Sequence, residues 1–537
     1  MISIQQIQLP ITHITADLEK KMADILGVHV NRTKDYTITK RAIDSRKKRE
    51  MIYLVYSVDV EIDDEEAVLK NRAVMKNKKH HRIEIKETYE YEIPDIDLSQ
   101  VDKRPIIIGT GPSGLFTALL LSKAGMKPLV IERGGNVDAR VKDVEDFLGE
   151  GELNTSSNIQ FGEGGAGTFS DGKLNTLITN PRIKYIFDEF VHAGAPTSIL
   201  WDAKPHIGTD KIRKVAKNMR KQIIELGGEF RFNTTLTDIK ITDNVITSIV
   251  LDEAEEIETD TLVLAIGYSA RDTYRMLYEK KVDLEQKQFS IGVRIEHKAE
   301  MINKAQYAKF YDNKKLGSAK YKLVSHSKEN RSVYSFCMCP GGYVMPSTAQ
   351  DGCLVTNGMS EYAQDGENSN AALLVNVGKE DFKSDHPLAG MQFQEKWEKK
   401  AFELGGSNYH APVQLVGDFL ENKKTVKMKS ITPTYKPGVT PTSLSECLPN
   451  FVVASIKEAL PHLNNKIKGF SHPDAVLTAI ESRSSSPLRI TRDKESMQST
   501  NIAGIYPAGE GAGYAGGIVS SAVDGLKVGE AIIKNYV

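Results

Sequence analysis

The chain has 537 residues, a formal net charge of −1 at pH 7 and 40% hydrophobic side chains. This length exceeds what one hydrophobic core normally serves, so two or three domains are expected. The near-balance of 70 basic and 71 acidic residues excludes an overall electrostatic attraction to nucleic acid or to an anionic membrane.

The first hundred residues predict a small α+β domain, 1–100. Alternating stretches such as ISIQQIQL and MIYLVYSVDVEI indicate strands, and ADLEKKMADILG has a helical pattern. A ferredoxin-like sandwich is the expected arrangement, followed by a polar linker, IPDIDLSQVDKRP. The start lacks the pattern of a signal peptide, and the apolar runs are too short to span a bilayer. We therefore expect a cytoplasmic protein without a membrane partner.

Two basic clusters in this domain raise the alternative of a surface that recruits RNA or a protein partner. They comprise Lys40, Arg41, Arg46, Lys47, Lys48 and Arg49, and then Lys76, Lys78, Lys79 and Arg82. Acidic residues elsewhere in the domain offset them, and no aromatic RNA-stacking motif accompanies them. A solvated charged face is the favoured interpretation, and salt-sensitive RNA binding would support the alternative.

The segment RPIIIGTGPSGLFTALLLSKAGMKPLVIERGG, 104–135, predicts a β-α-β unit that binds a dinucleotide. Gly109 allows the tight turn after the first strand, Gly111 lets backbone approach a pyrophosphate, and Gly114 lets the helix pack on the strand. The start of the helix, at Pro112 and Ser113, would face the phosphates. Glu132 closes the second strand, where a carboxylate can accept hydrogen bonds from a ribose.

Further contacts with the cofactor are expected immediately after this unit. Arg133 and Arg140 could reach the phosphates or the adenosine. The stretch NIQFGEGGAGTFSDGKLNT, 158–176, is interpreted as backbone that passes close to an extended cofactor, with a flexible surface loop as the alternative. The expected contacts in this stretch are Gly164, Gly165, Ala166, Gly167, Ser170 and Lys173.

The dinucleotide-binding domain is expected to be discontinuous, 101–285 and 485–537. Its first part ends in short strands, the last of which runs into Gly267. Near the C-terminus Gly509 and Glu510 follow a strand, and Gly516–Gly517 open a helix from Ile518 onwards. The N-terminus of that helix could face the pyrimidine edge of a flavin and stabilise the charge that reduction places there.

Residues 286–484 would form a substrate or cap domain inserted between those two parts. The Cys337–x–Cys339 spacing differs from that of redox and zinc motifs, so no metal site is expected. We expect all four cysteines, including Cys353 and Cys447, to be buried thiols. Candidate acids or anchors near the flavin are Arg294, His297, Tyr343, His472, Arg483 and Tyr514. Arg483 could grip a substrate carboxylate or form an ion pair between the domains; for Arg294 and His297 sheet packing is favoured.

Six motifs in order give the chain a resemblance to a known group: IIIGTGPSGLF, IERG, IQFGEGGAGTFSDGKL, SFCMCPGGYVMPS, AIESRSSSPLRI and YPAGEGAGYAGGI. It resembles FAD-dependent dehydrogenases of the glutathione-reductase-like class and, more closely, a bacterial group of uncharacterised FAD-dependent, or NAD(FAD)-utilising, dehydrogenases. The resemblance implies that Gly109, Gly111 and Gly114 hold the FAD pyrophosphate, Glu132 the ribose and Glu510 the ribityl chain. Gly517 and Ile518 would meet the flavin ring.

The sequence therefore predicts an α/β flavoprotein: a Rossmann-type FAD domain, an inserted α+β cap and an N-terminal α+β domain. The expected activity is hydride transfer between non-covalent FAD and a small organic substrate. NADH or NADPH could serve as a transient electron donor, although no second glycine triplet suggests a dedicated NAD domain. A non-catalytic structural flavoprotein is the remaining alternative, and the oligomeric state is open.

Overall fold

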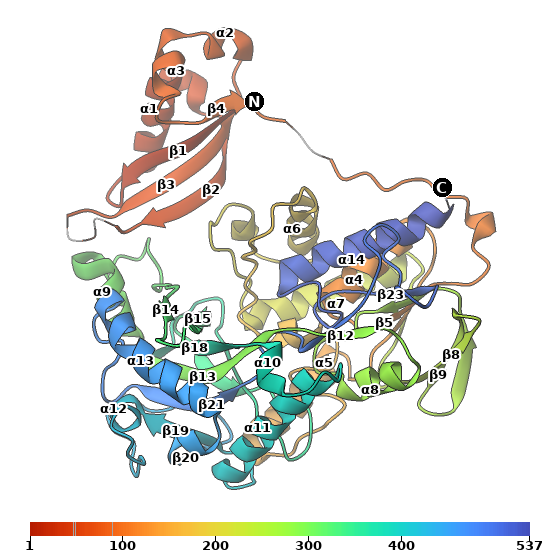
Figure 1. Cartoon of the computed structure of the whole chain (residues 1–537). Helices are drawn as coiled ribbons and strands as arrows, with labels where there is room; N and C mark the ends of the chain where they lie inside the picture. Colours follow the sequence, from red (N-terminus) through yellow and green to blue (C-terminus); the bar gives the residue numbers. More distant parts are fainter. Residues whose placement is uncertain (47, 49, 88–89, 537) are drawn as a thin grey trace.

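The computed structural model describes residues 1–537 except 47, 49, 88–89 and 537. A small N-terminal domain is joined by a linker to a larger body (Figure 1). Lys47 and Arg49, two members of the first basic cluster, lie outside the described residues. None of the helices in the described part of the chain combines the length and apolar character that a membrane span needs.

The N-terminal domain is a four-stranded antiparallel sheet with strand order β2-β3-β1-β4. Its elements are β1 (Ile2–Pro10), α1 (Thr15–Leu26), β2 (Tyr36–Asp44), β3 (Tyr53–Val60), α2 (Glu65–Leu69), α3 (Arg72–Asn77) and β4 (Ile83–Ile85). Leu18, Met22 and Leu26 of α1 share a core with Ile2 and Ile4 of β1. This is the β-α-β-β-α-β order of a split βαβ unit.

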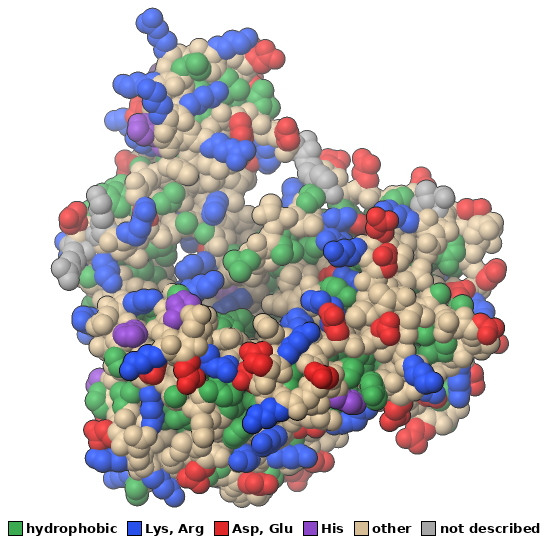
Figure 2. Space-filling view, in the orientation of Figure 1, with side chains coloured by type: hydrophobic (Ala, Val, Ile, Leu, Met, Phe, Trp, Pro, Cys, Tyr) green, Lys and Arg blue, Asp and Glu red, His purple; other side chains and the backbone are tan. Residues whose placement is uncertain are grey.

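Several basic side chains of this domain have protein partners. Arg46 pairs with Asp44 at 2.6 Å and Arg82 with Glu84 at 2.9 Å, and the Arg41 guanidinium lies 4.4 Å from the centre of the Trp201 ring. On the face that Figure 2 shows, Lys and Arg side chains of this domain are interspersed with Asp and Glu. RNA binding by this domain stays an untested prediction.

The centre of the larger body is a five-stranded parallel sheet, order β23-β11-β5-β6-β7. The strands are β5 (Ile106–Ile108), β6 (Leu129–Ile131), β7 (Glu229–Arg231), β11 (Leu262–Leu264) and β23 (Ile505–Pro507). The accompanying helices are α4 (Pro112–Lys123), α5 (Val137–Glu150), α6 (Arg182–His192), α7 (Thr209–Glu225), α8 (Arg271–Glu279) and α14 (Ile518–Ile533). An antiparallel sheet of β8 (Leu236–Thr242), β9 (Val245–Leu251) and β10 (Glu255–Glu258) accompanies them.

The two faces of the parallel sheet are covered differently because successive side chains of a strand point to opposite faces. Ile107 of β5 joins the core that contains α4, α7 and α14. Its neighbours Ile106 and Ile108 join the core that contains the β8–β9 hairpin and α8. All three isoleucines are buried, as expected for a central strand of a covered parallel sheet.

The cap is built on a seven-stranded mixed sheet, order β14-β15-β18-β13-β21-β19-β20. Its strands are β13 (Phe289–Lys298), β14 (Val324–His326), β15 (Ser332–Cys339), β18 (Asn368–Val377), β19 (Ala411–Leu415), β20 (Val439–Pro441) and β21 (Val476–Glu481). A separate hairpin joins β16 (Tyr343–Pro346) and β17 (Thr356–Met359). The helices are α9 (Ala299–Tyr307), α10 (Lys379–Phe382), α11 (Ala389–Gly405), α12 (Val416–Leu420) and α13 (Asn450–Lys466).

The chain enters and leaves the cap at one place. β12 (Leu284–Gln286) pairs with β22 (Leu488–Ile490) in antiparallel register, so the two crossings lie side by side. In Figure 1 the cap sheet lies beside the parallel sheet, with α11 and α13 in front of it. This arrangement places the ends of several cap strands against the loops that follow the parallel strands.

Gly114, in the first turn of α4, is required for packing. A Cβ at this position would lie 2.0 Å from the carbonyl oxygen of Gly109, because α4 starts directly against the end of β5. We expect Gly114→Ala to lower the free energy of unfolding by about 3 kcal/mol, at the upper end of the usual cost of overpacking, as measured by chemical denaturation. Gly149→Ala is the control, since an added Cβ there meets nothing within 4 Å; equal stability of both variants would contradict the expectation.

Candidate functional site

A cavity lies between the parallel sheet and the cap, at the carboxyl ends of β5, β6, β11 and β23. Its empty volume is about 1410 Å³, including the part that is open to solvent. Loops of the parallel sheet and the glycine-rich stretch 160–170 form most of its wall. The cap contributes Phe336, Cys337, Asn357, Glu481, Arg483 and Ser484.

Six of the glycines predicted to contact the cofactor fall into two groups. An added Cβ would lie 2.3 Å from the Ala265 carbonyl oxygen at Gly109 and 2.0 Å from the Gly109 carbonyl oxygen at Gly114, so these two glycines permit close approach of the protein's own backbone segments. At Gly111, Gly267, Gly516 and Gly517 an added Cβ would meet nothing within 4 Å, and all four line the cavity. These four glycines therefore keep space open for a ligand rather than for the protein's own atoms.

Two helices begin at this cavity without a side chain that caps them. Gly111 precedes α4 and Gly517 precedes α14, and neither cap position supplies a side-chain hydrogen bond. The unpaired N–H groups and the helix dipole at such a terminus favour an anion. The buried Ser113 Oγ in the first turn of α4 lines the cavity and has no hydrogen-bond partner in the described residues, so it is available to a bound phosphate.

Glu132 lies at the cavity, but its carboxylate is already hydrogen-bonded to protein. Oε2 accepts hydrogen bonds from Thr110 N at 3.0 Å and Thr110 Oγ1 at 2.7 Å. Oε1 accepts from Gly134 N at 3.0 Å and Gly162 N at 2.9 Å. Glu132 thus joins the loop after β5 to the glycine-rich stretch, in addition to any contact with a ribose.

Of the predicted cofactor contacts in the glycine-rich stretch, Gly165, Ala166, Gly167 and Ser170 line the cavity, as do Pro112, Arg133, Gly267, Gly509 and Ile518 elsewhere. Arg140 does not line the cavity. Its guanidinium is fully buried and donates to the carbonyl oxygens of Asn158, Ile159 and Glu163 at 2.7, 2.8 and 2.7 Å. Arg140 therefore supports the backbone of this stretch, and its contact with the cofactor stays an untested prediction.

Gly164 and Lys173 also lie outside the cavity lining. The Gly164 backbone has a φ of +82°, and an added Cβ would lie 2.0 Å from Thr168 Oγ1, so this glycine serves the turn itself. Lys173 forms an ion pair with Asp171 at 2.8 Å and turns toward two cysteines of the cap. The prediction that these two residues contact the cofactor stays untested.

Arg483 lines the cavity, and an ion pair largely occupies its guanidinium. Its Nη2 lies 2.8 Å from Glu398 Oε2 and its Nη1 donates to Ser269 Oγ at 2.9 Å. The same carboxylate receives two hydrogen bonds of 2.8 Å from Arg271 of α8. Of the two roles expected for Arg483, this geometry favours the ion pair that joins the cap to the parallel-sheet domain.

Three other predicted catalytic residues do not line the cavity. His297 is fully buried, its Nε2 lies 2.7 Å from the Phe470 carbonyl oxygen, and burial lowers its pKa to about 4. The Tyr514 ring is covered by the Arg492 guanidinium at 3.9 Å. Arg294 is buried beside the cavity and bonds the Cys337 carbonyl oxygen at 2.9 Å. Tyr343 and His472 lie outside the lining as well.

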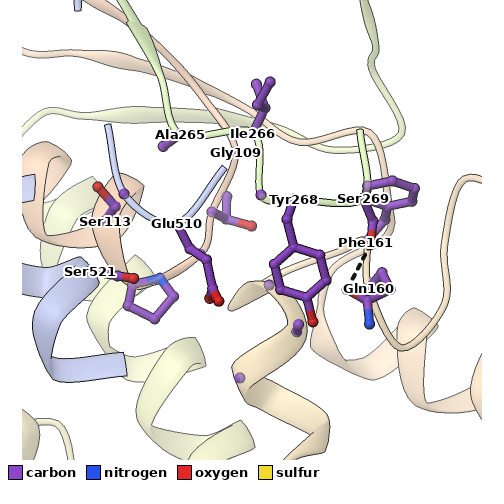
Figure 3. Close-up of a pocket in the computed structure, with 18 of the residues that line it drawn as sticks. Gly109, Ser113, Gln160, Phe161, Ala265, Ile266, Tyr268, Ser269, Glu510 and Ser521 are labelled. Carbon is purple, nitrogen blue, oxygen red and sulfur yellow. Dashed lines mark hydrogen bonds between the residues drawn. The ribbon is translucent and has the colours of Figure 1, made fainter. Parts of the chain in front are cut away.

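The structure adds residues that sequence reasoning missed. Figure 3 shows the Tyr268 ring and the Glu510 carboxylate projecting into the same open space, with Ser269 and Gln160 beside them. Ser269 Oγ donates to Gln160 Oε1 at 3.1 Å. Tyr268 and Ser269 directly follow Gly267 at the end of a predicted strand, and this position could have indicated that they lie at the cavity. Asn357 and Glu481 come from cap strands, and no local sequence pattern indicates that they line the cavity.

Glu510 is a half-buried carboxyl group whose pKa is raised. Burial raises its pKa to about 7, and the negative charge of Cys337 adds to this rise while Lys287 opposes it. Because the folded pKa lies above the unfolded one, the folded chain holds an extra proton here at mildly acidic pH. The stabilisation is complete below the unfolded pKa and is lost as the pH rises through about 7.

Without cofactor, the free energy of unfolding of the wild type should fall between pH 5 and pH 8. We expect a smaller fall in Glu510→Gln. The difference should be on the order of 3 kcal/mol, since one pKa unit corresponds to about 1.4 kcal/mol. Unfolding by denaturant at the two pH values measures it. Glu403→Gln, at an exposed position of α11, is the control. A pH dependence identical to that of the wild type would show that Glu510 does not titrate in this range.

Comparisons with known proteins agree with this geometry. Residues 288–484 match a family described as "FAD-dependent protein, C-terminal domain-like", and residues 1–61 match a "Domain of unknown function (DUF8436)". An "Uncharacterized protein" of Clostridium beijerinckii (strain ATCC 51743 / NCIMB 8052) is 46% identical over 537 residues, which is 100% of this chain and 99% of that protein.

Solved structures show more distant likenesses. L-proline dehydrogenase from P. horikoshii is 11% identical, with 81% of this chain and 94% of that chain covered and a TM-score of 0.36. Glycine oxidase from Bacillus cereus ATCC 14579 is 12% identical, with 81% and 95% covered and a TM-score of 0.31. Halogenase PltM in complex with phloroglucinol and FAD is 12% identical, with 80% and 67% covered and a TM-score of 0.35. Structural likenesses with TM-scores this low do not indicate a function.

The parallel sheet, the cavity at its carboxyl edge and the match of residues 288–484 to an FAD-dependent protein domain together support FAD as the cofactor. The chain belongs to the same family as the Clostridium beijerinckii protein, to which it is similar along its whole length.

Proposed function

We propose that this flavoprotein is an oxidoreductase that transfers a hydride between flavin N5 and a small organic substrate. One observation carries the proposal: two uncapped helix N-termini and four glycines open to ligand space line a single cavity. One terminus suits the pyrophosphate and the other the electron-rich edge of a flavin ring. The placement among glutathione-reductase-like enzymes stays a prediction from the sequence.

In this proposal FAD is held without a covalent bond. Gly111 and the first turn of α4, including Ser113, would hold the pyrophosphate, with Glu132 and Arg133 at the adenosine end. Gly517 and Ile518 would lie against the flavin ring, and Glu510 would contact the ribityl chain. Bound FAD supplies the two-electron chemistry, and the chain supplies orientation, exclusion of water and a proton-holding carboxyl group.

The substrate would lie on the cap side of the cavity, beside Asn357, Glu481 and Ser484. Burial raises the pKa of Glu481 to about 7, against the opposing charge of Arg294. A carboxyl group with this pKa can hold or accept a proton near neutral pH. Among the described residues there is one five-stranded parallel sheet, so NADH or NADPH would have to dock in the same open site.

The test is an anaerobic titration of the purified protein with NADPH and with NADH, after the bound flavin has been identified by chromatography. Loss of flavin absorbance, near about 450 nm for this cofactor class, on addition of one donor would support a reductase half-reaction. Reduction by neither donor, combined with reduction by a screened organic substrate, would support a dehydrogenase. A folded wild type that cannot be loaded with FAD would overturn the proposal, and a flavin that no donor reduces would indicate a structural role.

A further inference from the structure

Two cysteines meet at the cap side of the cavity, at the end of β15. The pairing of β15 with β18 is regular up to Phe336 and resumes only at Cys339, so the strand bulges at Cys337. The Cys337 backbone has a φ of +42°, a conformation that is rare for a residue with a side chain and recurs at functional sites. A bulge redirects a side chain, and Cys337 lines the cavity whereas Cys339 is buried.

Both sulfur atoms lie against the same ammonium group. Lys173 Nζ is 3.8 Å from Cys337 Sγ and 3.4 Å from Cys339 Sγ. Asp171, which is buried, holds Lys173 at 2.8 Å, and Ser360 Oγ donates to Asp171 at 2.6 Å. On the other side, Arg294 Nη2 lies 3.6 Å from Cys339 Sγ. Two cations, brought from the glycine-rich stretch and from β13, therefore converge on the two thiols.

These surroundings separate the two cysteines from the other two in the chain. A hydrogen bond from the Cys339 thiol, with the charges of Lys173 and Arg294, lowers the pKa of Cys337. Burial raises the pKa of Cys353 to about 11 and that of Cys447 to about 12. A thiolate beside a cation and next to a second thiol is the arrangement of a reactive cysteine with a resolving partner. Three of the four cysteines are buried, as the sequence predicts, and Cys337 is the half-buried exception.

We propose that Cys337 and Cys339 are a redox-active dithiol pair that exchanges two electrons with flavin bound in the cavity. Cys337 is the sulfur that faces the flavin, Cys339 is the resolving thiol, and Lys173 is a positioning residue that holds the Cys337 thiolate. The identity of the electron partner rests on the proposed function; the existence of the pair does not.

The exchange balances without a further reactant. Opening the Cys337–Cys339 disulfide breaks one S–S bond, forms two S–H groups and takes up two electrons and two protons. Reduced flavin loses the same two electrons and two protons and becomes oxidised flavin. The pair thereby stores the equivalents of one hydride transfer, and the oxidised holoenzyme accepts four electrons per flavin rather than two.

The experiment counts electrons and thiols on the full-length, flavin-loaded protein after mild oxidation with diamide. Anaerobic titration with dithionite should take four electrons per flavin in the wild type and two in Cys337→Ser and in Cys339→Ser. Alkylation under denaturing conditions, followed by mass spectrometry, should modify only Cys353 and Cys447 before reduction, and all four cysteines after it. Cys447→Ser is the matched control and should keep the four-electron uptake.

The role of Lys173 has its own readout. In the reduced protein, Lys173→Met should slow alkylation of Cys337 by iodoacetamide at pH 7 by on the order of tenfold, because less thiolate is present. Lys173→Arg keeps the positive charge and should restore most of the rate. Equal rates in the wild type and Lys173→Met would overturn this role.

The outcomes also distinguish the pair from the flavin. If the chain binds no FAD, the proposed function fails, and alkylation still decides whether the disulfide forms. Four free thiols after oxidation would overturn the pair. A disulfide that forms while the wild type takes up two electrons per flavin would overturn the exchange with the cofactor.

Discussion

Gly111→Glu is expected to abolish FAD binding while the chain stays folded. The Gly111 backbone has φ of −65° and ψ of 176°, which any residue can adopt, and a Cβ there meets nothing within 4 Å. The new side chain would therefore enter the cavity at the N-terminus of α4 and place bulk and negative charge at the proposed pyrophosphate site. We expect at least about a hundredfold weaker binding, equivalent to about 3 kcal/mol, measured as flavin per protein and by fluorescence titration.

Gly149→Glu makes the same chemical change at an exposed position of α5, where an added Cβ also meets nothing within 4 Å. It should bind FAD as the wild type does. Circular dichroism of both variants separates loss of the cofactor from loss of the fold. A folded Gly111→Glu protein with the flavin content of the wild type would show that the dinucleotide does not approach this turn.

Local sequence patterns located the β-α-β unit because each part of it has a local cause. The apolar run before Gly109 became β5, α4 ends at Lys123 with Gly125 in a left-handed conformation, and α14 begins at Ile518 as expected. These features depend on glycine geometry and hydrophobic spacing within about 30 residues. The cavity wall that they form was predictable for the same reason.

The functions of individual polar side chains were less predictable, because their partners lie far away in the sequence. Arg140 lies close in sequence to the glycines that indicate phosphate binding. Its guanidinium nevertheless donates hydrogen bonds to carbonyl groups of the glycine-rich stretch. Tyr514 lies next to the flavin loop in sequence, but its ring packs under Arg492. The bulge that turns Cys337 toward the cavity depends on its pairing with β18, which no local pattern reveals.

The same limit applies to the buried cluster around Glu398. This carboxylate comes from α11, and its two arginine partners come from α8 and from the segment that returns from the cap. Sequence reasoning offered two roles for Arg483 and did not include Glu398 or Arg271. Only the folded structure shows that one carboxylate forms ion pairs with two guanidinium groups at the boundary between the cap and the parallel-sheet domain.

Glu398→Gln is therefore expected to destabilise the protein strongly. Glu398 is fully buried and accepts hydrogen bonds from Arg271, Arg483 and Ser482. Removing its charge leaves two buried guanidinium groups without their main counter-ion, and breaking such a pair typically costs roughly 3–5 kcal/mol. Denaturant unfolding followed by circular dichroism measures the loss. Glu403→Gln, an exposed position on the same helix, should leave the midpoint unchanged.

The difference between wild type and Glu398→Gln should also depend on pH. Burial alone would raise the pKa of Glu398, but the charges of Arg271 and Arg483 outweigh it, so the folded pKa is lowered. Its stabilising contribution is then complete above the unfolded pKa, about 4.3 for a glutamate, and is lost as the pH falls below that value. The two proteins should differ fully at pH 7 and converge toward low pH. A difference that persists unchanged in acid would assign the effect to packing rather than to charge.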